Sequence, residues 1–305
     1  MNNFYINSNN VIKKVKIILS VFLLLFLVYV LHSIVSADNQ DSGESIFRND
    51  KVQIDCTDTN TTGGIIINVV SKLDKRIKVT IEKGDIKYTY DLKNDTTVEV
   101  YPVQLGNGEY TIKVWIHAIE DKYALILSAK YTVKLTDRNA PFLNPSQYVN
   151  FNKDAEVVKI SADLTKNCIN DIEKVQAIYN FVIDSLVYDV HKAETVQSGY
   201  LPSVDAIIGS GKGICFDYAA VFAAMLRSQG IPAKLVTGYV KPNNEYHAWN
   251  EFYIKDQEWF KINDMKFNGE KFERIDPTFD SSSKSSKNVM QYIGDGSNYT
   301  KFLEF

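Results

Sequence analysis

Cys215 is the residue whose type and position best fit a chemical role. The stretch from 215 to 229 reads CFDYAAVFAAMLRSQ, an apolar helical pattern, and Gly230 and Pro232 follow it as stop signals. Cys215 therefore lies at a predicted helix start, where unpaired N–H groups and the positive end of the helix dipole favour a thiolate. A thiolate attacks carbonyl carbon, so the position indicates a nucleophile. Taken alone, it fits a small buried core cysteine equally well.

A nucleophilic cysteine needs a base, and the base needs an orienting partner. His247 lies in EYHAWNEFYI (245–254), whose aromatic and β-branched residues predict a strand. Asp276 lies in RIDPTFD (274–280), where the following Pro277 favours an extended backbone. Its carboxylate could accept the second N–H of an imidazole. Each residue alone also fits a structural role, as a hydrogen-bonded strand histidine and as a turn aspartate.

The three motifs occur together and in a recognisable order. The segments GKGICFDYAAVFAAMLRSQGIPAKLVTGYV, YHAWNEFYI and RIDPTFD resemble the transglutaminase-like superfamily in its bacterial branch, over roughly residues 168–280. The resemblance implies a papain-like α+β core with a Cys-His-Asp triad. In this chain Cys215 would be the nucleophile, His247 the general base and acid, and Asp276 the residue that orients the histidine.

The spacing between the histidine and the aspartate is longer here than in many members of the superfamily. Asn263 and Asp264 lie nearer the usual position and compete with Asp276 for the third role. We favour Asp276, because the context IDPTF matches the family motif. The intervening residues 258–274 predict an extra hairpin around the turn dipeptide Asn268-Gly269.

An acyl-transfer site also needs donors for the oxyanion. The backbone N–H of Cys215 is the first expected donor, because it lies at the helix start. Tyr200, in GYLP (199–202), is placed like an upstream polar aromatic residue of relatives and is the candidate second donor. Trp249, two residues after His247, is a candidate for lining the substrate groove. Both aromatic residues also fit ordinary core packing.

The N-terminus predicts a membrane-directed segment over residues 1–37. Lysines at 13, 14 and 16 precede the apolar stretch IILSVFLLLFLVYVL (17–31), and Val35-Ser36-Ala37 resembles a signal cleavage site. An uncleaved membrane anchor is the alternative interpretation. The lysines keep that end cytoplasmic in both cases. We therefore expect an extracytoplasmic protein, secreted or anchored at the outer face of the cytoplasmic membrane, which touches the membrane only through this segment.

The remaining chain divides by its pattern. Residues 38–50 predict a polar tether, 51–137 a β-sandwich domain, 138–152 a linker, and 153–305 the transglutaminase-like domain. The β-domain is expected to be small and immunoglobulin-like, because short strands are evenly spaced without helices. Helices are predicted over 154–166 and 170–187, a low-complexity loop over 281–287, and a last strand in the tail. The strands predicted for the β-domain are 64–70, 76–83, 86–92, 96–103, 108–116 and 123–135.

Composition excludes several classes of function. The formal net charge is −3, and the apolar N-terminal segment carries only basic charges, so the body is acidic and offers no surface for nucleic acid. The chain has three cysteines, so Cys56 and Cys168 could pair and leave Cys215 free. There is no CxxC motif and no histidine cluster, and we expect neither a metal nor a cofactor.

Two classes of function remain. The first is a cysteine enzyme that acts on amide bonds of proteins or peptides, such as surface proteins or cell-wall peptides, through an acyl-thioester on Cys215. The triad is common to hydrolysis and to amine transfer, which would cross-link the substrate. A de-amidating or glycan-linked amidase is a weaker variant of this class. The second is a catalytically silent surface module of the same fold, which binds or scaffolds.

Overall fold

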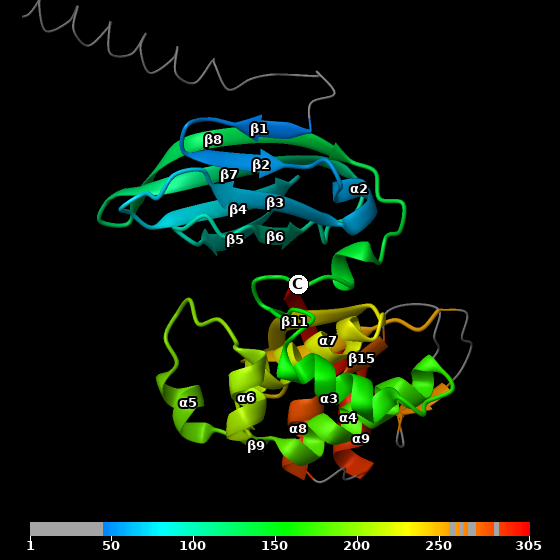
Figure 1. The fold of residues 1–305 in the computed structure, drawn as a ribbon. Coiled ribbons are helices and arrows are strands. Elements are labelled where there is room, and N and C mark those ends of the chain that lie inside the picture. The colour runs from blue at the N-terminus through cyan, green and yellow to red at the C-terminus, as the bar shows by residue number, and fades with distance from the viewer. Residues whose placement is uncertain (1–44, 256–259, 263–264, 268–272, 284–286) are drawn as a thin grey trace, which may run out of the picture.

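The computed structural model describes residues 45–255, 260–262, 265–267, 273–283 and 287–305. An N-terminal part made mostly of strands lies against a C-terminal part in which helices gather on one side of a sheet (Figure 1). The predicted signal or anchor over 1–37 lies outside the described residues. Within the described ranges, no helix is both long enough and apolar enough to span a membrane.

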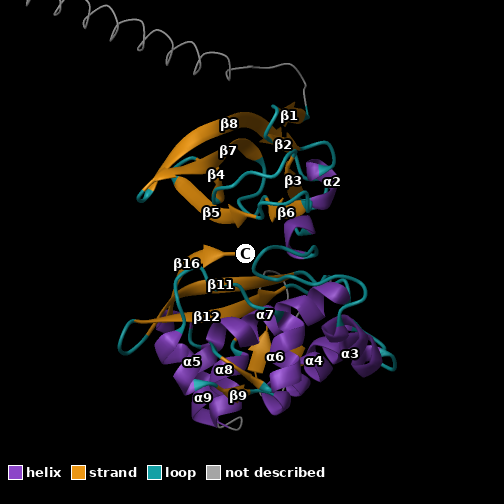
Figure 2. Ribbon diagram, turned by 60° about the vertical axis from the view of Figure 1, so that its left-hand side comes forward, coloured by secondary structure: helices purple, strands orange, loops and turns teal. Residues whose placement is uncertain are grey.

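The N-terminal part contains two four-stranded antiparallel sheets (Figure 2). Alternating side chains from both sheets are buried in a common hydrophobic core, as with Ile65 and Ile67 in one sheet and Val79 and Ile81 in the other. The β-rich pattern is therefore confirmed, whereas the immunoglobulin-like assignment stays a prediction. The first sheet has the order β1 (Ile46–Arg48), β2 (Val52–Asp55), β3 (Gly64–Val69), β6 (Glu99–Pro102), and the second the order β5 (Ile86–Leu92), β4 (Ile77–Lys83), β7 (Gly108–Ile119), β8 (Lys122–Val133). A short helix, α2 (Thr59–Thr62), connects β2 to β3.

The predicted tether over 38–50 is wrong at its C-terminal end. Residues 46–48 form β1, which pairs with β2 so that Phe47 lies opposite Ile54. Phe47 packs against the hydrophobic core, and its burial holds this edge strand in place despite the polar residues around it. Residues 38–44 lie outside the described residues.

The C-terminal part is built around α7 (Cys215–Ser228), which packs on a four-stranded sheet. The sheet has the order β15 (Glu273–Ile275), β12 (Glu245–Phe252), β11 (Ala233–Val240), β16 (Tyr299–Glu304). Residues 217–227 of α7 are all buried, and four alanines among them let neighbouring elements approach closely. The other elements are η1 (Ala140–Phe142), α3 (Glu156–Thr165), α4 (Asp171–Ser185), β9 (Val187–Tyr188), α5 (Val190–Thr195), α6 (Val204–Ser210), β10 (Lys212–Gly213), β13 (Phe260–Ile262), β14 (Met265–Phe267), α8 (Pro277–Ser283), α9 (Lys287–Gly294) and η2 (Gly296–Asn298). A mixed α+β architecture is confirmed.

Two local predictions in this part need correction. The extra hairpin exists as β13 and β14, but both strands precede Asn268-Gly269, so that dipeptide does not join them. The predicted loop over 281–287 begins inside α8, which continues to Ser283. There Ser282 Oγ donates to the carbonyl of Thr278 one turn earlier (2.8 Å), a bond that serine makes within a helix.

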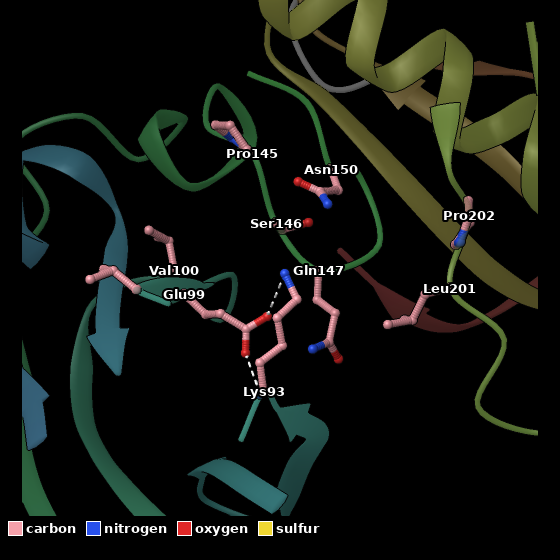
Figure 3. A pocket seen from close by; sticks show the side chains of 10 residues that line it. Lys93, Glu99, Val100, Pro145, Ser146, Gln147, Asn150, Leu201 and Pro202 are labelled. Carbon is pink, nitrogen blue, oxygen red and sulfur yellow. Dashed lines mark hydrogen bonds and ion pairs between the residues drawn. The ribbon is translucent and has the colours of Figure 1, made fainter. Parts of the chain in front are cut away.

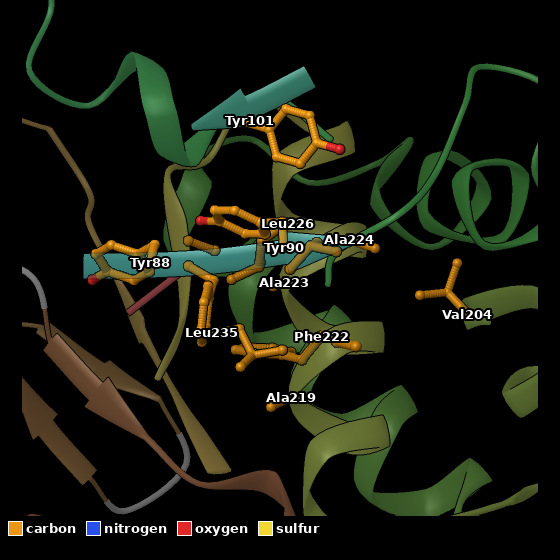
Figure 4. Packing of buried hydrophobic residues seen from close by; sticks show 14 of the residues in the cluster. Tyr88, Tyr90, Tyr101, Val204, Ala219, Phe222, Ala223, Ala224, Leu226 and Leu235 are labelled. Atoms are coloured by element: carbon orange, nitrogen blue, oxygen red, sulfur yellow. The ribbon is translucent and has the colours of Figure 1, made fainter. Parts of the chain in front are cut away.

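The two parts meet around Phe305 and Arg227. The ring of Phe305 lies among Tyr88, Tyr90 and Tyr148, with centroid distances of 5.5, 6.5 and 4.4 Å. The buried guanidinium of Arg227 donates to the carbonyls of Ala233, Asn144 and Phe305. Figure 4 draws part of the hydrophobic cluster that contains Tyr88 and Tyr90 of β5 as well as Leu226 of α7. The strands and the α+β part thus share one continuous core.

Candidate active site

Cys215 is the first residue of α7, as predicted, and Ile214 before it has an extended backbone. The Asp217 N–H donates to the carbonyl of Ile214 (2.9 Å), whereas the N–H groups of Cys215 and Phe216, the first two of the helix, have no acceptor in an α-helical ladder and point out of this end. Asp217 in the same turn reaches back, and its Oδ2 accepts from the N–H of Ile214 (2.9 Å). A Cβ atom at Gly213 would lie 2.7 Å from Cβ of Asp217, so glycine is needed where the chain enters the helix. The loop that carries the nucleophile is therefore fixed on both sides.

His247 lies on β12 with 6% of its surface exposed, and it is bound to Asp276. Its Nε2 donates to Oδ2 of Asp276 at 2.8 Å. The imidazole stacks almost parallel on Phe279, with centroids 4.4 Å apart and planes 8° apart. With Nε2 engaged, Nδ1 is the nitrogen available to Cys215, which interacts with this histidine. The structure therefore places Cys215, His247 and Asp276 together in the order that a triad requires.

Asp276 is buried between β15 and α8, and four donors hold its carboxylate. Oδ2 accepts from His247 and from the hydroxyl of Tyr299 (2.8 Å). Oδ1 accepts from the backbone N–H groups of Thr278 and Phe279, each at 3.2 Å. Hydrogen bonds of this kind stabilise the ionised form. The predicted competitors Asn263 and Asp264 lie outside the described residues.

The environment of His247 favours the imidazolium. Burial alone would lower the pKa of His247, but the charge of Asp276, its hydrogen bond and the contact with Cys215 outweigh this effect and raise the pKa to about 10. A cationic imidazole beside a thiol stabilises the thiolate. The geometry thus supports an imidazolium at His247 at neutral pH, in contact with Cys215.

This raised pKa predicts how stability depends on pH. The imidazolium of His247 should stabilise the fold fully below pH 6.5, its unfolded value, and this contribution should disappear as the pH rises toward about 10. We expect His247→Gln, in a Cys215→Ala background that removes the thiol, to cost on the order of 2 kcal/mol at pH 6 and much less at pH 10. Urea unfolding of both proteins across this range measures the difference. A difference that grows with pH would contradict the ion pair.

Cys215 and His247 open into a pocket of about 320 Å³. Segment 188–200, which includes α5, forms one wall, and β11 and β12 form another. Among the described residues, the lining of this pocket includes no Asp, Glu, Lys or Arg side chain. The lining residues are Tyr188, Ala193, Val196, Gln197, Gly199, Tyr200, Ile214, Cys215, Phe216, Thr237, Tyr246, His247 and Ala248.

The two predicted accessory residues differ in their placement. Tyr200 lines the pocket, but its hydroxyl donates its hydrogen to Oδ1 of Asp217 (2.6 Å), so a role as oxyanion donor would require this bond to break and stays a prediction. Trp249 is not among the pocket-lining residues. It is 1% exposed, and a Cβ atom at Gly238 would lie 2.8 Å from its ring. The indole therefore fills the space above a glycine in the neighbouring strand instead of facing a groove.

Four residues of this site were not identified from the sequence: Tyr299, Phe279, Lys192 and Asp217. Phe279 lies in the motif quoted for Asp276, and Asp217 lies in the motif quoted for Cys215. Each is within one helical turn of its motif's main residue, so the sequence alone could have placed it close to the site. Lys192 and Tyr299 lie in segments without any motif, and only the fold brings them close.

A second hollow, of about 180 Å³, lies where the two parts of the molecule meet (Figure 3). Lys93 and Glu99 form an ion pair on its N-terminal side, and Leu201 and Pro202 face it from the α+β part. Its described lining contains no cysteine or histidine. All three cysteines are described and free, hence Cys56 and Cys168 do not pair.

Comparisons with known proteins agree with this geometry. The transglutaminase-like superfamily matches residues 158–263, a range that includes Cys215 and His247 and ends before Asp276. Kyphoscoliosis peptidase of Mus musculus is 29% identical over 107 residues, which are 32% of this chain and 16% of that protein. Protein-glutamine gamma-glutamyltransferase of Pseudomonas aeruginosa is 33% identical over 70 residues, 19% of this chain and 10% of that protein.

This chain therefore spans 16% or less of the length of either curated relative. Among solved structures, a Cytophaga hutchinsonii protein described as a candidate cysteine protease is 17% identical with a TM-score of 0.41, and the match covers 85% of this chain and 73% of that one. Red sea bream transglutaminase is 13% identical with a TM-score of 0.31, covering 80% of this chain and 50% of that one. Residues 158–263 therefore form a domain that matches the transglutaminase-like superfamily.

Proposed function

We propose that this protein is an extracytoplasmic cysteine enzyme that cleaves or transfers amide acyl groups through a thioester on Cys215. The observation that supports this proposal best is the connected set of Cys215, His247 and Asp276 at the edge of one pocket. A silent module would have no need for a buried imidazole that is held cationic by a fully hydrogen-bonded carboxylate. Such perturbed groups cluster at functional sites.

The reaction follows from these positions. The thiolate of Cys215 attacks the amide carbon, and the carbonyl electrons move to the oxygen, where the amides at the start of α7 can donate to it. When the C–N bond breaks, the imidazolium of His247 gives its Nδ1 proton to the leaving amine. Water or a second amine then attacks the thioester, loses a proton to His247, and releases Cys215. Asp276 keeps its charge throughout and holds the imidazole in place.

The pocket supports an uncharged acyl donor. Its lining has no charged side chain other than the catalytic pair, and transfer of an unpaired charge into such a site is costly. A carboxamide such as that of glutamine, or a peptide amide, meets this condition. We therefore propose proteins or peptides as substrates, with surface proteins and cell-wall peptides as the accessible classes.

The proposed location depends on the N-terminal segment. Lysines before the apolar stretch 17–31 support export with the N-terminus retained on the cytoplasmic side. N-terminal sequencing of the mature protein tests this assignment: a chain that starts after residue 37 indicates cleavage, and an intact Met1 in the membrane fraction indicates an anchor. Recovery of the full chain from the cytosol would contradict both.

The function is tested on the full chain with two parallel assays. One measures incorporation of a fluorescent primary amine into casein, and the other measures hydrolysis of the side-chain amide of a blocked glutaminyl-glycine dipeptide. We expect at least one activity above background, and the ratio of the two reports whether an amine or water accepts the acyl group. If neither appears and Cys215 alkylates no faster than a free thiol at pH 7, the silent surface module replaces this proposal.

A further inference from the structure

A charged cluster lies at the start of α7, the helix that begins with Cys215, and the reaction above does not use it. Lys192 Nζ, from α5, donates to Oδ2 of Asp217 at 2.5 Å and to the hydroxyl of Tyr200 at 2.7 Å. The same hydroxyl donates to Oδ1 of Asp217 at 2.6 Å. With the N–H of Ile214 as a further donor, both carboxylate oxygens are engaged. Asp217 is completely buried, whereas the Lys192 side chain is 27% exposed.

Asp217 has two opposite effects at this position. Its bond to Ile214 fixes the backbone that leads into the helix start, and a carboxylate in the first turn also suits the helix dipole. However, a buried anion two residues after Cys215 opposes the formation of a second anion on the sulfur. The loop needs the carboxylate for its geometry, while the chemistry needs its charge to be cancelled.

We propose that Lys192 is a positioning residue of the active site, whose ammonium cancels the charge of Asp217 so that this carboxylate can anchor the nucleophile loop without suppressing the Cys215 thiolate. The inference rests on the proposed role of Cys215 as the nucleophile. It also assigns a purpose to α5, which has no buried residue and reaches the core through Lys192. Burial alone would lower the pKa of Lys192, but its bonds to Asp217 and Tyr200 raise it, so the cation persists through neutral pH.

Two other ionisable groups near Cys215 lie outside the cluster of Lys192, Asp217 and Tyr200. His247 faces the sulfur from β12, with Asp276 behind it, and Tyr188 interacts with it from β9. Tyr200 belongs to the cluster itself, because its hydroxyl bonds to both Lys192 and Asp217. Changes at Lys192 and Asp217 therefore report on the cluster and leave the imidazolium intact.

The test is the pH dependence of iodoacetamide alkylation at Cys215, followed by mass spectrometry of its peptide in the full chain. Lys192→Met leaves the anion alone, so the pH of half-maximal rate should move up by about one unit. Asp217→Asn leaves the cation alone, so that pH should move down. The double variant, Lys192→Met with Asp217→Asn, should return close to wild type. Lys174→Met is the matched control, because Lys174 pairs with Asp171 on α4 and its side chain is 28% exposed.

The outcomes separate the cluster from the proposed function. Opposite shifts that cancel in the double variant support charge compensation. Shifts in the same direction, or none for Lys192→Met, overturn it, because loosening of the loop alone would slow both single variants. If thermal denaturation shows that Asp217→Asn does not fold, Lys192→Arg takes its place in the test. Because arginine keeps the positive charge, Lys192→Arg should show the wild-type pH profile of Cys215 alkylation, whereas Lys192→Met should not. A wild-type Cys215 that reacts no faster than Cys168 would refute the nucleophile itself.

Discussion

Replacing Cys215 with alanine is expected to abolish both amine incorporation and amide hydrolysis, by at least about 10³-fold, while the protein stays folded. The loss is this large because the sulfur forms the covalent intermediate and nothing else in the pocket lining is a comparable nucleophile. Serine at the same position should be nearly as inactive, since a hydroxyl is not ionised by a neighbouring imidazolium. Initial rates with either substrate measure the effect, and circular dichroism reports the fold.

The matched control is Cys168→Ala, because Cys168 is free and half-buried like Cys215 but lies outside the pocket. This variant should keep full activity. Alkylation should also follow a clear order: Cys215 first, Cys168 more slowly, and Cys56 hardly at all, because burial raises the pKa of Cys56 to about 12. Residual activity in Cys215→Ala that equals the wild-type rate would exclude the proposed mechanism.

Asp276→Asn is expected to lower kcat by about 10³- to 10⁴-fold with little change in KM. An amide at this position can present its NH₂ group to Nε2 of His247, which then carries no hydrogen, and the proton moves to Nδ1, where it blocks the approach to Cys215. The imidazolium also loses the charge that stabilises it. Steady-state kinetics with the blocked dipeptide measure this loss.

Two further variants show whether Asp276 holds the third position of the triad. Asp264→Ala should be close to wild type, since the orienting carboxylate is already supplied, and a large loss there with a normal Asp276→Asn would reverse the assignment. Tyr299→Phe removes one of the four donors to Asp276 and should lower kcat by about 5- to 30-fold. The loss of activity should therefore be largest for Asp276→Asn, smaller for Tyr299→Phe and smallest for Asp264→Ala, as expected if Asp276 and Tyr299 share one hydrogen-bond network.

The three residues proposed as a triad could be predicted because each one carries a local signature. Gly213 and the apolar run after Cys215 mark a helix start, and Pro277 marks an extended aspartate. The alternating residues around His247 mark a strand. These patterns depend on near neighbours in the chain, and the structure reproduces α7 and β12, whereas helix α8 directly after Asp276 was not predicted.

The supporting residues could not be predicted, because they depend on register and on contacts between distant segments. Tyr299 reaches Asp276 although β16 pairs with β11 and two strands, β12 and β11, separate it from β15. Trp249 shares a strand face with His247, yet Gly238 opposite the histidine leaves space that the indole fills. Tyr200 was predicted as a donor, but its partner Lys192 comes from a short polar helix that has no periodicity to read. Sequence spacing alone contains none of these facts.

Strand β16 has a consequence for the molecule as a whole. Tyr299 at its start binds the catalytic carboxylate, and Phe305 directly after it packs among the tyrosines of the N-terminal sheets. Loss of order in those sheets would release this end of β16 and weaken the support of Asp276. Any molecule that binds and stabilises the N-terminal sheets would therefore also favour the active arrangement, and by reciprocity an occupied active site would tighten that binding. The strand makes the two parts of the protein thermodynamically linked.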